Sequence, residues 1–237
     1  MKRIFSAFVA VVLAGGAVFA TMFCNGLSGI RVNPSYKKGQ IKVACVGDSV
    51  TYGHSIKNWQ RNNYPALLSK MLGEEYCVKN FGVSGSTVQP DGDQPYVATK
   101  AYTQSLSYEA DILVFMMGSN DSKPENWKGE EAFLMEFNKL LEAYLQSEKK
   151  TTVYLCTPPV AYFPEGVSEG LTNYDIQPQY VQAVNELVKT VAAERGITVI
   201  DINELTTDRR DLFGKDNVHP NNEGAEVIAK AVYAAIV

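Results

Sequence analysis

The stretch I-K-V-A-C-V-G-D-S-V-T-Y-G at residues 41–53 decides the fold of this chain. Residues 41–46 are mostly apolar and rich in β-branched side chains, which is typical of a strand buried on both faces. The strand pattern stops at Gly47, and Asp48 and Ser49 follow directly. An open α/β sheet binds its ligands at the carboxyl ends of its strands. We therefore hypothesise that Ser49 is a nucleophile at such an edge.

Length and composition indicate one globular domain. The chain has 237 residues, of which 46% are hydrophobic and 20% are charged, and these values are ordinary for a globular protein. The net charge at pH 7 is -4, and no basic stripe runs along the chain. This argues against nucleic acid and against anionic membrane surfaces as partners.

Residues 1–23 have the composition of a targeting segment. Lys2 and Arg3 precede an apolar run, and small residues around Ala20 suit the cleavage of a signal peptide. An apolar run of about 20 residues is also long enough to remain in a bilayer as an N-terminal membrane anchor. Cys24 adds a third alternative, a lipidated cysteine. All three alternatives place the rest of the chain outside the cytoplasm, either secreted or tethered at the cell surface.

Residues 24–40 contain Gly, Ser and Pro and are interpreted as a linker, which leaves one domain at 41–237. Within this domain, apolar runs of strand length alternate with helical stretches. The predicted strands cover residues 41–46, 76–81, 111–117, 152–156 and 198–202. The predicted helices cover residues 62–72, 97–108, 130–147, 180–195 and 223–237. This alternation predicts an α/β fold whose parallel sheet has helices on both faces.

Polar segments, or segments rich in Gly and Pro, follow four of the predicted strands. They are residues 47–49, 82–85, 118–121 and 157–159. Right-handed crossovers bring the carboxyl ends of all parallel strands to one edge of the sheet. We therefore expect these four segments, which are distant in sequence, to meet at one crevice.

A serine nucleophile needs a base, a group that orients the base, and donors for the developing oxyanion. The chain has two histidines, His54 and His219. Asp216 precedes His219 by three residues, so in a tight loop it can accept the Nδ1 proton and leave Nε2 to face Ser49. The alternative for His219 is a surface histidine before a helix. For His54 the alternative is a loop or pocket-wall residue, and its role stays open.

Three groups are candidate oxyanion donors: the backbone N–H groups of Ser49 and Gly82, and the side-chain amide of Asn120. Glycine lets a backbone N–H approach a ligand closely because it has no Cβ. The alternatives are a plain turn glycine and a turn or helix-cap asparagine. The sequence holds no C-x-x-C pair and no Cys/His cluster, so we expect no metal site.

Four short motifs coincide with the predicted strand ends and the last histidine. They are Gly47-Asp48-Ser49, Asn80-Phe81-Gly82, Gly118-Ser119-Asn120-Asp121 and Asp216-Asn217-Val218-His219. In order and spacing they resemble the four sequence blocks of the SGNH/GDSL hydrolase superfamily, and the resemblance extends from residue 41 to the C-terminus. It implies a flavodoxin-like, three-layer fold with five parallel strands. The G-x-S-x-G elbow of the α/β-hydrolases is absent, because Thr51 stands where its second glycine would be.

For the site, the resemblance implies Ser49 as the nucleophile, His219 as the base and Asp216 as the residue that orients the base. It also implies an oxyanion hole formed by the Ser49 and Gly82 N–H groups and the Asn120 side chain. None of these roles needs a metal or a cofactor. The implied activity is the hydrolysis of carboxylic esters by acyl transfer.

The segment S-K-P-E-N-W at residues 122–127 bears on the substrate. Trp127 can stack on a sugar face and Lys123 can bond to hydroxyl groups, while Asp48 is a third candidate contact beside the nucleophile. The alternative for Trp127 is that it packs the loop against the body. The stretch is similar to secreted bacterial members of the superfamily that resemble sialate O-acetylesterases or acetylxylan esterases.

We therefore expect a serine esterase that removes acetyl groups from carbohydrate or from another small-molecule ester. Two alternatives stay open. One is a lipid esterase of the lysophospholipase or thioesterase type, which needs an apolar acyl groove, and the other is a non-catalytic carbohydrate-binding protein of the same fold. The long connection at 161–179 is a candidate lid or substrate rim.

Overall fold

The structure is a computed structural model that describes residues 33–146, 149–170 and 172–237. The leader predicted at 1–23 and the predicted alternatives for Cys24 lie outside the described residues, so they stay predictions. In the described part of the chain, no helix is both long and apolar enough to cross a membrane.

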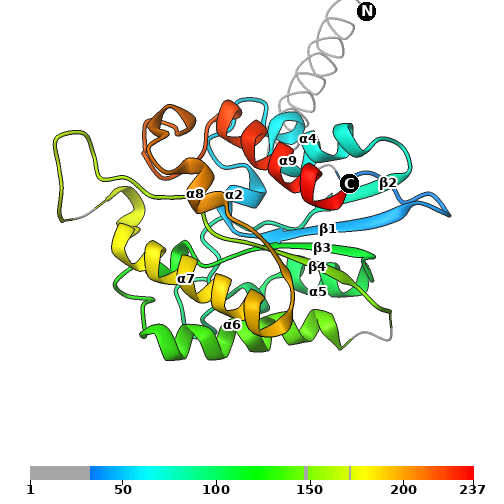
Figure 1. Cartoon of the computed structure of the whole chain (residues 1–237), viewed down its shortest axis with the longest axis horizontal. Helices are drawn as coiled ribbons and strands as arrows, with labels where there is room; N and C mark the ends of the chain where they lie inside the picture. Colours follow the sequence, from blue (N-terminus) through cyan, green and yellow to red (C-terminus); the bar gives the residue numbers. More distant parts are fainter. Residues whose placement is uncertain (1–32, 147–148, 171) are drawn as a thin grey trace, which may run out of the picture. The chain divides into compact units, whose positions relative to one another are not determined.

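The five strands form one parallel sheet in the order β2-β1-β3-β4-β5 (Figure 1). Their bounds are β1 Ile41–Gly47, β2 Tyr76–Asn80, β3 Ile112–Met116, β4 Thr152–Cys156 and β5 Thr198–Ile200. The chain passes from β1 to β2 on one side and then to β3 on the other, so the strand order reverses at β1. This is the flavodoxin-like order, in which ligands bind at the reversal point. The predicted α/β fold is confirmed.

Helices cover both faces of the sheet, as predicted. In Figure 1, α4 and α9 lie above the sheet, and α5, α6 and α7 lie below it. Their bounds are α4 Tyr64–Leu72, α5 Lys100–Ser107, α6 Glu130–Leu145, α7 Pro178–Arg195 and α9 Asn222–Ile236. The sheet is therefore the middle of three layers.

The sheet divides the core into two clusters. On β1, Val43 and Cys45 face the α4–α9 layer, whereas Ala44 and Val46 face the α5–α7 layer, because successive strand side chains point to opposite faces. All four side chains are at most 1% exposed. Burial on both faces is the reason that this strand is a continuous apolar run without alternation.

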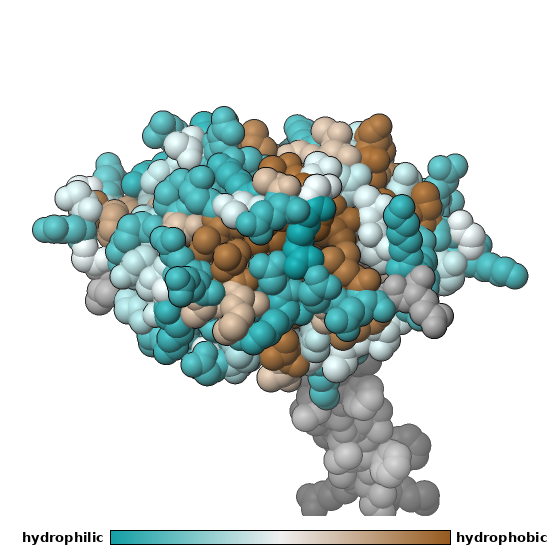
Figure 2. All heavy atoms as spheres, turned by 60° about the horizontal axis from the view of Figure 1, so that its bottom comes forward, coloured by the Kyte–Doolittle hydropathy of each residue, from teal (hydrophilic) through white to brown (hydrophobic). Residues whose placement is uncertain are grey.

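The α5–α7 layer presents a mixed outer surface. Figure 2 brings this side of the domain forward and shows hydrophobic side chains gathered near its middle, with hydrophilic side chains around them. On α6, Phe133, Phe137 and Leu141 are buried against the sheet, whereas Met135 is half exposed. This spacing of three to four residues is that of an amphipathic helix.

N-cap residues set two boundaries that differ from the predicted ones. The predicted helix at 62–72 is interrupted at Asn63, whose side chain caps α4. The predicted strand at 198–202 ends early because the Asp201 side chain caps the short helix α8 (Ile202–Thr206). In both cases a side-chain oxygen accepts a bond from a free N–H of the first turn, which starts a helix at that point.

Candidate active site

Ser49 lies at the carboxyl end of β1, where the short helix α2 (Ser49–Tyr52) begins. Asp48 is the N-cap of this helix, and its carboxylate accepts a hydrogen bond from the Val50 N–H at 2.9 Å. Asp48 is 1% exposed, and burial raises its pKa. It does not line the cavity beside Ser49. The expected substrate contact of Asp48 is therefore corrected: this carboxylate is buried and shapes the turn that presents Ser49.

The structure brings Ser49, His219 and Asp216 into one hydrogen-bonded chain. The Nε2 atom of His219 lies 2.9 Å from the Ser49 Oγ, and its Nδ1 atom lies 3.0 Å from the Asp216 Oδ2. Ser49 and His219 are only 6% and 5% exposed. The order of groups is hydroxyl, imidazole and carboxylate, which is the order that nucleophilic catalysis by serine requires.

Hydrogen bonds hold Asp216 in its ionised form. Its Oδ1 accepts the backbone N–H groups of Val218 and His219 at 3.0 and 2.9 Å. Burial alone would raise the pKa of Asp216, but the bonds from the His219 ring and from these N–H groups hold it well below its usual range. Ser55 Oγ also donates to Asp216 Oδ2 at 3.2 Å. Ser55 carried no signal in the sequence, because its distance from Asp216 is set by the fold.

A cavity of about 110 Å³ lies beside Ser49 and His219. Part of its lining is polar and comes from Ser84, Gly85, Asn120 and Lys123. Another part is apolar and comes from Val50, Pro159, Ala161, Ile176, Val181 and Val218. Ser119 and the rings of His54 and Tyr174 also line it. The predicted crevice is thus formed by segments that follow β1, β2, β3 and β4.

Residues 45–227 match the family model described as GDSL-like lipase/acylhydrolase. The chain belongs to the GDSL-like lipase/acylhydrolase family. An acetylxylan esterase of Xylanibacter ruminicola is 33% identical to it over 221 residues, which are 86% of this chain and 44% of that protein. This GDSL-like protein spans less than half the length of that relative.

Solved structures share the fold of this GDSL-like protein. The aryl esterase of M. smegmatis has a TM-score of 0.65 at 16% identity, over 83% of this chain and 98% of that one. Est24, a carbohydrate acetylesterase from Sinorhizobium meliloti, has a TM-score of 0.66 at 19% identity, again over 83% and 98%. At these identities the likeness establishes the architecture alone.

Gly82 of this GDSL-like protein does not occupy the place expected for an oxyanion donor. Its N–H donates to the Asn80 side chain at 2.9 Å, and it is not part of the cavity lining. A Cβ on Gly82 would lie 2.3 Å from the backbone nitrogen of Tyr52. Because it has no Cβ, Gly82 lets the chain after β2 pack directly against the backbone of α2. The prediction that Gly82 lies at the cavity is therefore corrected.

Gly85, three residues later, lies at the cavity wall instead. Its φ angle of +82° belongs to the left-handed region that favours glycine. None of the described residues accepts a hydrogen bond from its N–H. The only indication of this residue in the sequence was that it is the second glycine of the 82–85 segment.

Asn120 lies at the cavity, as expected, and its amide is held in one orientation. Its Nδ2 donates one hydrogen to the Ser86 carbonyl at 3.0 Å, which leaves the second hydrogen for another acceptor. Next to it, Asp121 accepts the N–H groups of Val88 and Gln89 at 3.0 and 2.9 Å. Burial raises the pKa of Asp121 to about 7. The loops after β2 and β3 are thereby fastened to each other.

The other two expected substrate contacts have different outcomes. Lys123 lines the cavity, and its Nζ forms an ion pair with Asp93 at 2.7 Å. Trp127 stacks on Tyr180 with ring centroids 4.8 Å apart and 11° between the planes, and it also packs against Phe133. It is not part of the cavity lining. The expected sugar contact of Trp127 is corrected, because the alternative of loop packing describes its position.

His54 lies at the cavity wall, and its ring centroid is 4.4 Å from that of His219. The predicted rim at 161–179 also reaches the cavity, through Ala161, Tyr174 and Ile176. Tyr174 was missed as an individual site residue. Its only sequence signal was its place in this long connection.

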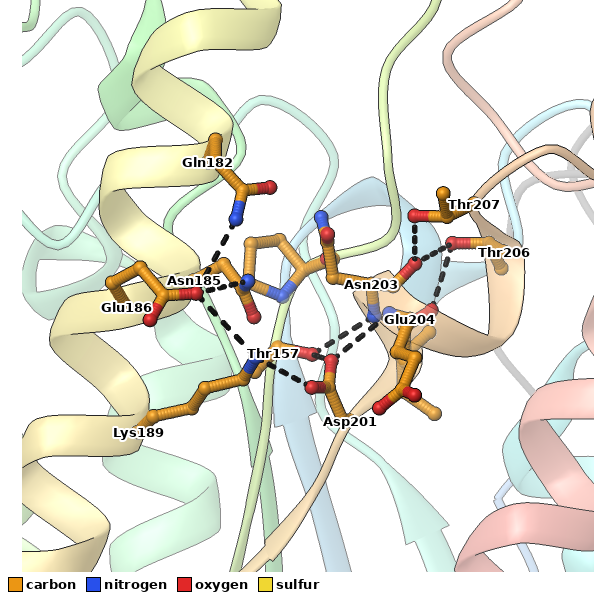
Figure 3. Close-up of polar contacts among 12 residues, drawn as sticks. Thr157, Gln182, Asn185, Glu186, Lys189, Asp201, Asn203, Glu204, Thr206 and Thr207 are labelled. Carbon is orange, nitrogen blue, oxygen red and sulfur yellow. Dashed lines mark hydrogen bonds and ion pairs between the residues drawn. The ribbon is translucent and has the colours of Figure 1, made fainter.

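A polar network, in which Thr157 and Asn203 are buried and Lys189 and Asp201 are partly exposed, supports the wall formed by the segment after β4 (Figure 3). Thr157 Oγ1 donates to Asp201 at 3.0 Å and accepts the Asn203 N–H at 2.9 Å. Lys189 on α7 forms an ion pair with Asp201 at 2.6 Å. The network therefore joins β4, α7 and α8 next to Pro159, which lines the cavity.

Within the part of the chain that the structure describes, no group of three or more His, Cys, Asp or Glu side chains could hold a metal ion. Cys45, Cys77 and Cys156 are buried free thiols. Burial raises the pKa of the Cys156 thiol to about 12, so it is uncharged at neutral pH.

Proposed function

We propose that this GDSL-like esterase removes acetyl groups from carbohydrate by acyl transfer through Ser49. The observation that carries the proposal is the chain of hydrogen bonds from the Ser49 hydroxyl through His219 to the Asp216 carboxylate, beside a small cavity. The acetylxylan esterase of Xylanibacter ruminicola, which shares 33% identity, supports the carbohydrate substrate.

In the proposed mechanism, Ser49 Oγ attacks the ester carbonyl while His219 Nε2 takes its proton. The imidazolium that forms is stabilised by the Asp216 carboxylate, which the backbone N–H groups keep ionised. His219 then protonates the leaving alcohol, and the acyl group stays on Ser49. In the second half, His219 activates a water molecule that releases the acid and regenerates the hydroxyl.

The oxyanion of the tetrahedral intermediate is proposed to bind the Ser49 N–H, the Gly85 N–H and the Asn120 side chain. Gly85 takes the place that the sequence suggested for Gly82. The Gly85 N–H has no acceptor among the described residues, and the Asn120 amide retains one hydrogen. Preorganised donors of this kind lower the barrier most when they are fixed before the reaction begins.

The cavity volume supports a short acyl group. About 110 Å³ is available beside Ser49, whereas sites for drug-sized ligands span about 300–1,000 Å³. The apolar lining of Ala161, Ile176 and Val181 suits a methyl group. We also propose that the esterase acts outside the cytoplasm, on the basis of the N-terminal sequence.

The test uses the full chain and its Ser49→Ala variant with p-nitrophenyl acetate, p-nitrophenyl palmitate and acetylated xylan. We expect acetate release from the first and third substrates, and its loss in the variant. A preference for palmitate would favour the lipid esterase alternative. Turnover of no ester at all would favour a carbohydrate-binding protein.

A further inference from the structure

The leaving alcohol of an ester bound at Ser49 must lie beside His219, because Nε2 of this imidazole returns the proton to it. Two other rings of the cavity lining surround the imidazole. The His54 centroid is 4.4 Å from that of His219, and the Tyr174 centroid is 5.0 Å away with the rings at 81°. These two rings therefore line the space next to the place that the leaving alcohol would take.

Tyr174 is an exposed aromatic ring at the rim of the cavity. It is 51% exposed, and its backbone has φ 63° and ψ 18° in the left-handed region. Asp175 follows with φ 57°. Two successive residues other than glycine in this region are energetically costly, and such backbone is found preferentially at ligand-binding sites.

Side chains hold this turn against the loop that carries His219. The Asn173 Nδ2 donates to the backbone carbonyl of Asp216 at 2.8 Å. The Thr172 hydroxyl donates to the carbonyl of Ile176 across the turn. The turn that carries Tyr174 is thereby bonded to the loop that carries His219.

His54 adds a polar group next to this ring. Its Nε2 lies 3.4 Å from the Tyr174 hydroxyl. Burial and the neighbouring His219 lower the pKa of His54, although Asp216 opposes the effect. A neutral imidazole carries one donor and one acceptor, which is the combination that a hydroxyl group matches.

We propose that Tyr174 and His54 form the binding site for the leaving sugar. The pyranose ring packs its apolar face against the Tyr174 ring, and a hydroxyl next to the ester bonds to His54. This proposal rests on the proposed function, because it takes the leaving alcohol to be carbohydrate. It assigns the stacking role to Tyr174 in place of Trp127, which is engaged with Tyr180.

The test compares two substrates that share the acetyl group and differ in the alcohol. One is an acetylated xylo-oligosaccharide, and the other is ethyl acetate, whose small alcohol cannot stack. The full chain is assayed with Tyr174→Ala, Tyr174→Phe, His54→Ala and His54→Asn. Tyr36→Ala serves as the control, because Tyr36 is also an exposed tyrosine and lies outside the cavity lining.

For Tyr174→Ala we expect kcat/KM on the oligosaccharide to fall by about tenfold, mainly through KM, with a clearly smaller loss on ethyl acetate. Tyr174→Phe keeps the ring and should retain most of the activity on the oligosaccharide. His54→Ala should also lower kcat/KM on the oligosaccharide relative to kcat/KM on ethyl acetate. His54→Asn should restore part of this loss, because the amide also donates and accepts. Tyr36→Ala should match the wild type on both substrates.

Equal losses on the two substrates in Tyr174→Ala would overturn the proposal, because they would mean that the ring acts only through His219. The proposal would also be overturned if, in both alanine variants, the ratio of kcat/KM on the oligosaccharide to kcat/KM on ethyl acetate stayed at the wild-type value. Failure of the proposed function gives a different result, namely wild-type protein that hydrolyses ethyl acetate but not the acetylated oligosaccharide. In that case the sugar site fails together with the carbohydrate assignment.

Discussion

The imidazole of His219 and the hydroxyl of Ser49 lie 2.9 Å apart, although 170 positions separate them in the sequence. The end of β1 supplies the hydroxyl, and the loop before α9 supplies the imidazole. Packing does not require this pair, since apolar side chains of similar size would fill the same space without two buried polar groups to satisfy. The arrangement is therefore best explained by the chemistry that the pair can perform.

Replacing Asp216 with asparagine tests the proposed orienting role. An asparagine amide can donate to Nδ1 of His219, which moves the ring proton to Nε2 and prevents it from accepting the proton of Ser49. We expect kcat on p-nitrophenyl acetate to fall by about 10⁴-fold with little change in KM. Asp208→Asn, which changes an exposed carboxylate, is the control. An Asp216→Asn protein that keeps about a tenth of the wild-type kcat would contradict the orienting role.

Gly82 and Gly85 should respond differently to alanine. In Gly82→Ala the new Cβ meets the Tyr52 backbone nitrogen at 2.3 Å, so we expect a loss of about 1–3 kcal/mol in unfolding free energy. In Gly85→Ala the Cβ meets only the end of the Gln94 side chain, but the positive φ costs about 1–2 kcal/mol and turns the N–H away.

For Gly85→Ala we therefore expect kcat to fall by up to about 10²-fold, since removal of a whole oxyanion donor costs about 10²–10³-fold. Denaturant unfolding and initial rates measure the two effects. Should Gly82→Ala keep wild-type stability and lose turnover while Gly85→Ala stays active, the assignment of Gly85 would be wrong.

Thr157→Val tests the network of Figure 3. Valine has nearly the same shape, but it leaves the buried Asn203 N–H without its acceptor and removes the bond to Asp201. We expect the unfolding free energy to fall by about 1–3 kcal/mol in urea denaturation. The matched control is Thr207→Val, because the Thr207 hydroxyl also bonds to Asn203 but the residue is exposed. Equal stability of the two variants would argue against a supporting role for the network.

Lys189→Met tests the pH dependence of the same network. Burial alone would raise the pKa of Asp201, but Lys189 and other donors lower it. A carboxyl group with a lowered pKa in the folded state stabilises the protein above its ordinary pKa of about 3.9, and this stabilisation is lost as the pH falls through the folded value. Lys189→Met should therefore be less stable than the wild type at pH 7, by about 1 kcal/mol or less for such a partly exposed pair.

The difference between Lys189→Met and the wild type should shrink as the pH falls below about 4, because the wild type then loses the same stabilisation. Urea denaturation between pH 7 and pH 3 measures it. Lys139→Met is the control, because the Lys139–Glu136 pair involves a 60% exposed lysine. A difference that stays constant down to pH 3 would show that the ion pair does not cause the lowered pKa.

The layout of the domain could be read from the sequence because buried parallel strands are continuous apolar runs. The segments after β1, β2, β3 and β4 were expected at one edge for the same reason, and they meet there. This kind of inference succeeds because it depends on strand direction, which the topology of α/β folds determines. It places segments, and it does not place individual atoms.

The finer assignments that failed depend on contacts between distant residues. The sequence shows two glycines in 82–85 but not which of them faces α2 and which faces the cavity. The indole of Trp127 stacks on the ring of Tyr180, which lies 53 residues further along the chain. Nothing in the sequence marks Tyr174 for a left-handed backbone, because tyrosine seldom adopts it.

The connection between β4 and α7 carries Tyr174 and Ile176, whereas Ser49, Asp216 and His219 all lie elsewhere in the chain. The proposed stacking contact with the sugar and the proposed acyl transfer thus belong to separate stretches of polypeptide. A chimaera that takes this connection from another esterase, and retains an asparagine to bond the Asp216 carbonyl, should keep its turnover of simple acetates. The chimaera should prefer the same sugar as the esterase from which the connection was taken.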